Sequence, residues 1–270
     1  MKMALLEVRG LSKRFGGLRA VDGVDLHVER GEVVGLIGPN GAGKSTLVEL
    51  LTGGQQASSG SIRFDGRDIT RLSNHERCRL GLARTFQVPQ PFAGGTVLEN
   101  VMVGALFGSQ TRTLSIEQAR DLAARTLQST GLGELCDRAP TSLTTAGLKR
   151  LELARCLATG AQMVFLDEPL GGLNPTEVNE AIELIRQVGK SGTTILFIEH
   201  IVPAVLSLCQ RVVVLANGRK LAEGSGEEVT QNPLVRKAYL GDVSSAADRY
   251  SRKGSRGAGN QQPVAERSND

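Results

Sequence analysis

Three glycines and a lysine stand close together between two apolar segments, in the sequence LIGPNGAGKST at residues 36–46. The spacing G-x-x-x-x-G-K-[ST] is typical of a loop that binds phosphate. Bare N–H groups and a helix start attract the oxygens, the lysine neutralises charge, and the hydroxyl can ligate Mg²⁺. We therefore predict a phosphate loop for a nucleoside triphosphate. Its members are Gly38, Pro39, Asn40, Gly41, Ala42, Gly43, Lys44, Ser45 and Thr46. The alternative is a glycine-rich turn in an α/β protein that binds no nucleotide.

Two adjacent carboxylates, Asp167 and Glu168, end the apolar segment MVFLDE. Ligands of open α/β sheets bind at the carboxyl ends of the strands, and neighbouring strand residues point to opposite sides. The two groups can therefore take different tasks. We predict that Asp167 lies beside Mg²⁺ and that Glu168 polarises a water molecule for attack on the γ-phosphate. The alternative is a solvated strand end.

The remaining pattern predicts the elements that position these groups. Short apolar or alternating segments alternate with helical ones after residue 160, which indicates βαβ units on a parallel sheet. A buried parallel strand precedes the phosphate loop, and residues 4–9 are expected to form an edge strand. Residues 98–157 are expected to be helical, with Ser115 and Gly131 at the ends of one helix. Residues 217–224 are expected to close a terminal hairpin.

Composition limits the class of protein. The chain has 270 residues, a net charge of +4, 3% aromatic residues and no Trp, which argues against a nucleic-acid partner bound by stacking. The four cysteines show no metal-ligand spacing, so we expect reduced thiols. The first residues do not resemble a signal peptide, and no window of eighteen apolar residues is present. Residues 243–270 are polar and predict a disordered tail, either solvated or loosely associated with an anionic surface.

Four motifs together resemble one family. GPNGAGKST, ARTFQ ending at Gln87, MVFLDEP, and His200 after TTILFIE occur in the order of the ATP-binding-cassette (ABC) ATPases. The segments KRFGGLRAV, TVLENVMVG, DEPLGGLNPTE and AYLGD resemble the subgroup of branched-chain amino-acid importers and their urea or amide relatives. Lipopolysaccharide-export ATPases share part of this set.

The resemblance covers residues 4–242 and implies an α/β fold, a P-loop NTPase with a RecA-like parallel sheet. It places this core and an antiparallel β subdomain at about residues 4–90 and 160–242. A helical subdomain is then expected at about residues 91–159.

The resemblance also assigns residues that spacing alone does not. Phe15 matches the aromatic residue that stacks on adenine, the alternative being a core Phe. Gln87 matches the residue that links Mg²⁺ and the attacking water to a transmembrane partner. His200 matches the histidine that contacts the γ-phosphate, the alternative being a capping or core His.

One motif departs from the family. The sequence LTTAG, residues 143–147, stands where the family has LSGGQ, the segment that binds the γ-phosphate held by the opposite subunit. Thr144 keeps a hydroxyl, Ala146 keeps its N–H but adds a methyl group, and the Gln side chain is absent. The expected result is a weaker dimer contact; the alternative is a site of low activity.

The resemblance implies the ATP-hydrolysing subunit of a bacterial importer, using ATP and Mg²⁺. It would form a homo- or heterodimer, bind transmembrane permease subunits near Gln87 and Phe92, and serve a periplasmic solute-binding protein. It would lie on the cytoplasmic side of the inner membrane, as a peripheral protein. The alternatives are a soluble ABC ATPase acting on DNA or ribosomes, a nucleotide sensor that does not hydrolyse ATP, and a lipopolysaccharide-export ATPase.

Overall fold

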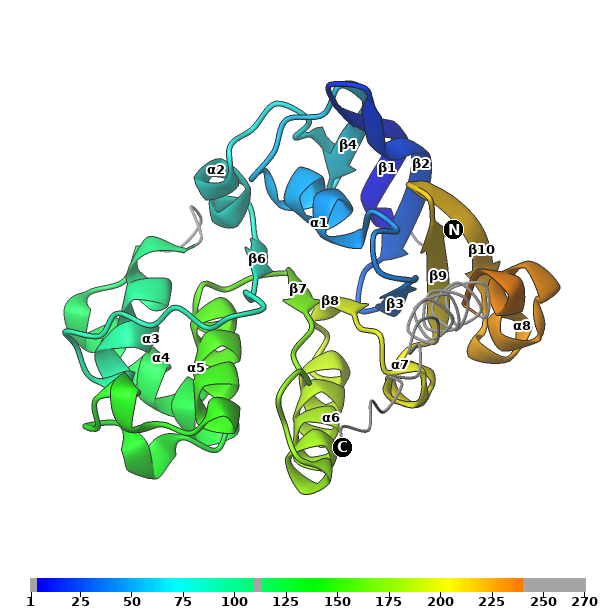
Figure 1. Cartoon of the computed structure of the whole chain (residues 1–270). Coiled ribbons are helices and arrows are strands. Elements are labelled where there is room, and N and C mark those ends of the chain that lie inside the picture. Colours follow the sequence, from blue (N-terminus) through cyan, green and yellow to red (C-terminus); the bar gives the residue numbers. More distant parts are fainter. Residues whose placement is uncertain (1–3, 109–112, 240–270) are drawn as a thin grey trace, which may run out of the picture.

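The computed structural model describes residues 4–108 and 113–239 and contains two sheets and a group of helices (Figure 1). The predicted tail at residues 243–270 lies outside the described residues. The strands are β1 (Ala4–Phe15), β2 (Leu18–Glu29), β3 (Val33–Ile37), β4 (Ser59–Phe64), β5 (Arg67–Asp68), β6 (Leu82–Arg84), β7 (Met163–Asp167), β8 (Thr194–Ile198), β9 (Arg211–Ala216) and β10 (Arg219–Gly224). The α-helices are α1 (Lys44–Thr52), α2 (Asn74–Arg79), α3 (Val97–Phe107), α4 (Ile116–Ser129), α5 (Thr145–Ala158), α6 (Pro175–Lys190), α7 (Val202–Leu208) and α8 (Gly226–Gln231). Short 3₁₀ turns lie at Gly133–Leu135 and Pro140–Ser142, and residues 233–239 are helical.

The larger sheet has six strands in the order β10-β9-β3-β8-β7-β6. Strand β3 pairs in parallel with β8 and β9, and β7 pairs in parallel with β8 and β6. All residues of β3, β7 and β8 are buried, because side chains on both faces of this sheet enter a core. The predicted parallel sheet is confirmed, and so is the hairpin that β9 and β10 form through the turn at Asn217 and Gly218.

Each face of the sheet packs against a different layer. On one face, leucines of α1 join one core with residues of β1, β2 and β4. On the other face, Ile185 and Val188 of α6 and Val205 of α7 form a second core with the parallel strands. Figure 1 shows α1 between the two sheets and α6 and α7 on the opposite side of the larger sheet. The loop from β3 to α1 is thus anchored by buried elements at both ends.

The smaller sheet is antiparallel, in the order β2-β1-β4-β5. Strand β1 pairs with both β2 and β4, so the prediction of an edge strand at residues 4–9 is wrong. The alternation of apolar and polar residues shows that one face of a strand is buried. It does not show how many strands flank it.

Helices α3, α4 and α5 form a helical lobe with a third core of its own. The predicted ends of one helix are confirmed: Ser115 caps α4 by accepting the N–H of Gln118, and Gly131 follows the helix with a φ of 73°. Figure 1 shows this lobe beside the sheets, joined to them through β6 and β7. The structure is therefore the expected α/β fold with an antiparallel sheet and a helical lobe.

Candidate functional site

The phosphate loop is fixed by close backbone contacts at two of its glycines. A Cβ atom at Gly38 would lie 2.3 Å from the carbonyl oxygen of Leu215, and one at Gly43 would lie 2.4 Å from that of Ala20. Gly43 also has a φ of 99°. At Gly41 a side chain would meet open space, so only its φ of 78° favours glycine there. Glycine at Gly38 and Gly43 is therefore required by packing as well as by backbone conformation.

Lys44 folds back over this loop. Its Nζ donates to the carbonyl oxygens of Gly38 at 2.7 Å and Pro39 at 3.2 Å, and the residue is only 8% exposed. Burial lowers the pKa of Lys44, while the nearby carboxylates of Glu168 and Asp167 favour its charged form. The ammonium group has a third donor, which an anion in the loop could use.

A cavity of about 460 Å³, which we call the phosphate cavity, opens at the phosphate loop. This volume lies in the range of small-molecule sites, about 300–1,000 Å³. The cavity brings together four regions that are distant in sequence: the loop, the start of β2, the residue after β7, and the turn between β9 and β10. Its lining consists of Leu18, Arg19, Ala20, Asn40, Gly41, Ala42, Gly43, Lys44, Ser45, Thr46, Glu168, Asn217 and Gly218.

Phe15 does not line this cavity. It ends β1, is 47% exposed, and its ring lies 5.0 Å from the ammonium group of Lys13. Leu18 and Arg19, from the same hairpin, line the cavity instead. The alternative of a core Phe does not fit this exposed side chain.

Asp167 lies at the buried end of β7. It is 7% exposed, and its Oδ2 is 3.4 Å from Nη2 of Arg84, a guanidinium that also pairs with Glu49 of α1. Burial raises the pKa of Asp167, and the charge of Arg84 opposes this shift. The carboxylate is held close to the phosphate loop with one fixed cation beside it.

Glu168 leaves the strand in a left-handed conformation. Its φ is 47°, and its N–H donates to the carbonyl oxygen of Ile198 at 3.0 Å. A non-glycine residue in this region costs about 1–3 kcal/mol and persists only where its surroundings hold it. Glu168 is the carboxylate among the residues that line the phosphate cavity.

Two further predicted residues meet Glu168. The amide Nε2 of Gln87 donates to Oε2 of Glu168 at 2.7 Å. The ring Nδ1 of His200 lies 3.9 Å from the other carboxylate oxygen and 3.6 Å from Oε2 of Glu199. The structure thus places two predicted residues, from two other segments, around the carboxylate of Glu168.

The segment LTTAG lies elsewhere. Thr144 caps α5, because its hydroxyl oxygen accepts the N–H of Gly147 at 3.2 Å. Ala146 lines a different, smaller cavity where α5 meets β7 and α6. Within the described residues, neither residue lines the phosphate cavity.

Sequence reasoning missed three residues at the site. The carboxylate of Glu199 is 0% exposed, accepts the N–H groups of Leu170 at 2.9 Å and His200 at 3.1 Å, and has a pKa raised by burial. Lys149 of α5 donates to the carbonyl oxygen of Glu168. Asn217 lines the phosphate cavity from the β9–β10 turn. Only Glu199 had a sequence signal, since it ends an apolar strand directly before His200.

A second opening separates the helical lobe from the sheet. This groove has a volume of about 440 Å³ and a mixed lining. Val103 and Phe107 on the lobe and Phe86 near β6 are apolar, while Arg79, Arg84, Glu152 and Arg155 are charged. The three apolar side chains are exposed, as is Phe92, whose ring lies against Arg155 of the groove lining. Exposed apolar patches of this kind often mark contacts with another protein.

The residues around the phosphate loop fit a magnesium ion. The Ser45 hydroxyl, the Asp167 carboxylate and the Gln87 amide offer oxygen ligands, which Mg²⁺ prefers. In the described part of the chain, no three His, Cys, Asp or Glu residues form a complete metal site. Mg²⁺ usually keeps several waters and is bound through one or two carboxylates and substrate phosphates. Among the described helices, none has the length and apolar character needed to cross a membrane.

The sequence matches known proteins over most of its length. A family model described as "ABC transporter" matches residues 21–171, and one described as "Branched-chain amino acid ATP-binding cassette transporter" matches residues 219–244. The chain is 41% identical to the high-affinity branched-chain amino acid transport ATP-binding protein BraF of Pseudomonas aeruginosa, covering 90% of this chain and 100% of that protein. It is 40% identical to LivG of Escherichia coli K12, a protein of the same description, with the same coverage. A solved ATP-binding cassette of an ABC transporter in its ADP conformation superposes with a TM-score of 0.80 at 34% identity, covering 88% of this chain and 99% of that chain.

Proposed function

Because the chain belongs to the ATP-binding proteins of ABC transporters, we propose that it is the ATPase subunit of an importer of branched-chain amino acids. Membership of this family makes the chain an ATP-binding protein and an ATPase. The observation that carries the solute class is the match of residues 219–244 to the branched-chain amino acid cassette. Urea, amides and other small polar solutes are the alternatives.

The phosphate cavity is the proposed ATP site. The backbone N–H groups of the phosphate loop and the ammonium group of Lys44 would hold the β- and γ-phosphates. Ser45, Asp167 and Gln87 would hold Mg²⁺, which neutralises phosphate charge when bound. Phe15, exposed at the end of the hairpin that borders the cavity, remains the predicted partner of adenine.

Glu168 is the proposed base. Its carboxylate borders the phosphate cavity, where it can orient a water molecule and accept its proton. Gln87 donates a hydrogen bond to one carboxylate oxygen, and His200 lies near the other. Catalytic contacts of this length often shorten once substrate is bound.

A second ATPase chain would complete each site. Thr144 and Ala146 belong to the helical lobe and do not line the phosphate cavity of their own chain. A head-to-tail dimer would bring the N-terminus of α5 from one subunit to the γ-phosphate bound by the other, where the helix dipole favours an anion. ATP binding would then close the dimer, and hydrolysis would open it.

The groove between the helical lobe and the sheet is the proposed docking site for permease subunits. It lies next to Phe86, directly before Gln87, whose side chain is bonded to Glu168. A permease helix in this groove could therefore sense the state of the ATP site. This docking would keep the protein on the cytoplasmic face of the inner membrane, as a peripheral subunit.

Reconstitution with the permease subunits and the periplasmic solute-binding protein tests the proposal. Leucine, isoleucine or valine should stimulate ATP hydrolysis, and Val103→Asp in the groove should abolish copurification with the permease. Ile116→Asp, on an exposed part of α4 outside the groove, is the matched control and should leave assembly intact. Stimulation by urea or amides alone would overturn the solute class. Copurification with ribosomes and no membrane protein would favour the soluble ABC ATPase.

A further inference from the structure

One ammonium group of the helical lobe reaches the backbone of the proposed base. Lys149 lies near the N-terminus of α5, and its Nζ donates to the carbonyl oxygen of Glu168 at 2.9 Å. The side chain is half-buried. Burial lowers the pKa of Lys149, while Glu199, Glu168, Glu152 and Asp167 all favour its charged form. The lobe thus contributes a cation to a group of carboxylates that belong mostly to the core.

The peptide that Lys149 contacts has an unusual conformation. Glu168 is one of three non-glycine residues with positive φ in the described part of the chain. Its carbonyl oxygen accepts one other hydrogen bond, a longer one of 3.3 Å from the N–H of Gly171. A hydrogen bond from an ammonium group is stronger than one between neutral groups. Lys149 is therefore well suited to hold this strained peptide in place.

We propose that Lys149 is a positioning residue. Its hydrogen bond to the Glu168 carbonyl keeps the backbone in the conformation that directs the carboxylate toward the phosphate cavity. Because Lys149 belongs to α5, the orientation of the base then depends on the position of the helical lobe. The inference rests on the proposed role of Glu168 as the base.

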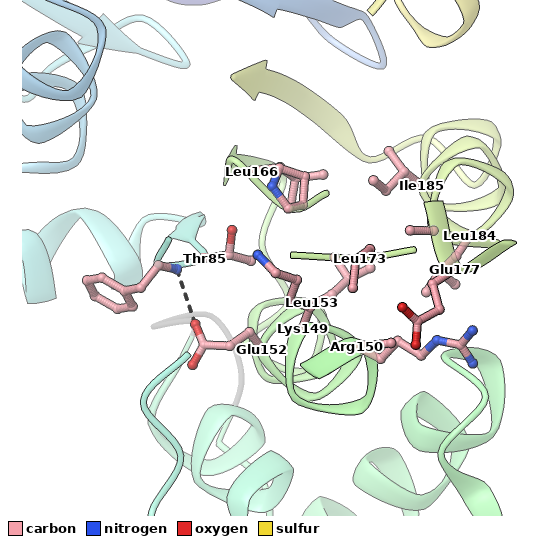
Figure 2. A pocket seen from close by; sticks show the side chains of 14 residues that line it. Thr85, Lys149, Arg150, Glu152, Leu153, Leu166, Leu173, Glu177, Leu184 and Ile185 are labelled. Carbon is pink, nitrogen blue, oxygen red and sulfur yellow. Dashed lines mark hydrogen bonds between the residues drawn. The ribbon is translucent and has the colours of Figure 1, made fainter. Parts of the chain in front are cut away.

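The contact lies at a junction that is not fully packed. Figure 2 shows Lys149 on the α5 side of a cavity whose other walls include Leu166 of β7 and Leu173. Its volume is about 40 Å³, enough for a water molecule, for which about 10–15 Å³ suffices. Because side chains do not fill this space completely, we expect the polar contacts across the junction to help set the position of α5.

The adjacent residue supplies a matched control. Arg150 also crosses the junction, but it pairs with Glu180 of α6 and does not contact Glu168. Loss of either side chain removes one polar contact between the lobe and the core. Only loss of Lys149 releases the Glu168 peptide.

The experiment measures steady-state ATP hydrolysis and nucleotide affinity for the ATPase assembled with its permease. The variants are Lys149→Met, Lys149→Arg, Arg150→Met and Glu168→Gln. We expect Lys149→Met to lower kcat about tenfold or more, because small displacements of catalytic groups have effects of this size. KM and nucleotide affinity should stay within about twofold of wild type, since the phosphate loop is untouched. Lys149→Arg should restore most of the rate, and Arg150→Met should lower kcat by less than about threefold.

Each outcome supports or overturns the inference. Equal kcat for Lys149→Met and Arg150→Met overturns it, because both would then act only by docking the lobe. A rise in KM with unchanged kcat also overturns it. If Lys149→Met proves unstable in thermal unfolding, Lys149→Arg provides the test instead. A Lys149→Arg protein that is folded but does not support turnover overturns the inference. Normal turnover of Glu168→Gln would overturn the assignment of Glu168 as the base. If Glu168→Gln is arrested but Lys149→Met turns over ATP at the wild-type rate, only the role of Lys149 is overturned.

Discussion

Two helices of this protein begin at predicted phosphate contacts, and their first turns are built differently. Helix α1 has Gly43 at its N-cap, which offers no side chain to the free N–H groups of the first turn, and the residues of that turn line the phosphate cavity. Helix α5 starts at Thr144, whose hydroxyl already accepts the N–H of Gly147. A helix end normally finds partners for its free N–H groups. The first turn of α1 is therefore open to a ligand, whereas one N–H group in the first turn of α5 already has a partner in its own chain.

The same contrast extends to burial. The groups around α1, including Lys44 and Asp167, are buried and held by fixed partners, while Thr144 and Thr145 are exposed. A preformed site can bind a nucleotide within one chain. An exposed, self-capped helix end gains a phosphate contact only when a second chain approaches. The first region should therefore control binding and chemistry, and the second should control association.

The largest effect is expected for Glu168→Gln. Removing a general base typically costs about 10²–10⁴-fold in rate, so turnover in the assembled transporter should fall at least about 100-fold. Nucleotide binding should persist, and the ATP-bound dimer should accumulate in size-exclusion chromatography. Normal ATPase rates would show that the chemistry depends on another group.

The next effect is expected for Lys44→Ala. Each hydrogen bond between charged groups contributes about 1.5–3 kcal/mol, so nucleotide affinity should fall about 10–100-fold. Titration calorimetry with ATP and Mg²⁺ measures this change. Lys190→Ala, at the exposed C-terminal end of α6 and outside the cavity, is the control and should bind normally. Unchanged affinity for Lys44→Ala would contradict the assignment of the phosphate loop.

A smaller effect separates capping from phosphate contact at α5. Thr144→Ala removes a cap and should destabilise the protein by about 1 kcal/mol, or about 2–4 °C in Tm for a protein of this size. Asn174→Ala removes the cap of α6, whose side chain accepts the N–H groups of Thr176 and Glu177, and should cost about the same.

Turnover should distinguish these two caps. If Thr144 also contacts the γ-phosphate across the dimer, Thr144→Ala lowers the ATPase rate of the assembled transporter more than Asn174→Ala does. Equal rates in the two variants would leave Thr144 with capping as its whole role.

The smallest effect is expected in the pH dependence of stability, and its sign follows from the raised pKa of Asp167. Burial raises the pKa of Asp167 above its ordinary value of 3.8, so the folded state binds this proton more tightly than the unfolded state. The free energy of unfolding therefore falls as pH rises from the ordinary pKa through the raised one, and it stays lower above that. Asp167→Asn should raise Tm of the nucleotide-free protein at pH 7.5, and the difference should shrink as pH falls toward 4.

Asp68→Asn is the matched control for this prediction. Asp68 is exposed, and its hydrogen bonds with Thr70 lower its pKa. Ionisation of Asp68 therefore stabilises the folded state, whereas ionisation of Asp167 destabilises it. This variant should not raise Tm. A lower Tm for Asp167→Asn would show that the attraction between Arg84 and Asp167 outweighs the cost of burying the carboxylate.

Local patterns predicted most elements correctly, including the strand and helix on either side of the glycine-rich loop, while phosphate binding by that loop stays a prediction. Periodicity, caps and glycine spacing act over a few residues, so the sequence contains them directly, as at Ser115 and Gly131. The edge position of residues 4–9 was predicted wrongly, because strand order depends on distant pairing. The expected convergence of Gln87 and His200 on Glu168 came from family resemblance, and no local pattern contains it.

Other parts of the site could not be predicted at all. Lys149 contacts Glu168 from 19 positions away in sequence, and Asn217 reaches the phosphate cavity through a turn between two strands. Neither residue differs in type or spacing from an ordinary surface residue. Phe15 shows the opposite case. Its motif predicts a contact with adenine, but its side chain is not among the residues that line the phosphate cavity.

Side-chain periodicity and glycines at fixed positions act between near neighbours, so they already specify most strands and helices and the loop that is predicted to bind phosphate. The side chains that surround Glu168, and the position of the tip of α5 away from the phosphate loop of its own chain, depend on the fold. These contacts form when separate elements pack together, and packing fixes distances that no local pattern encodes.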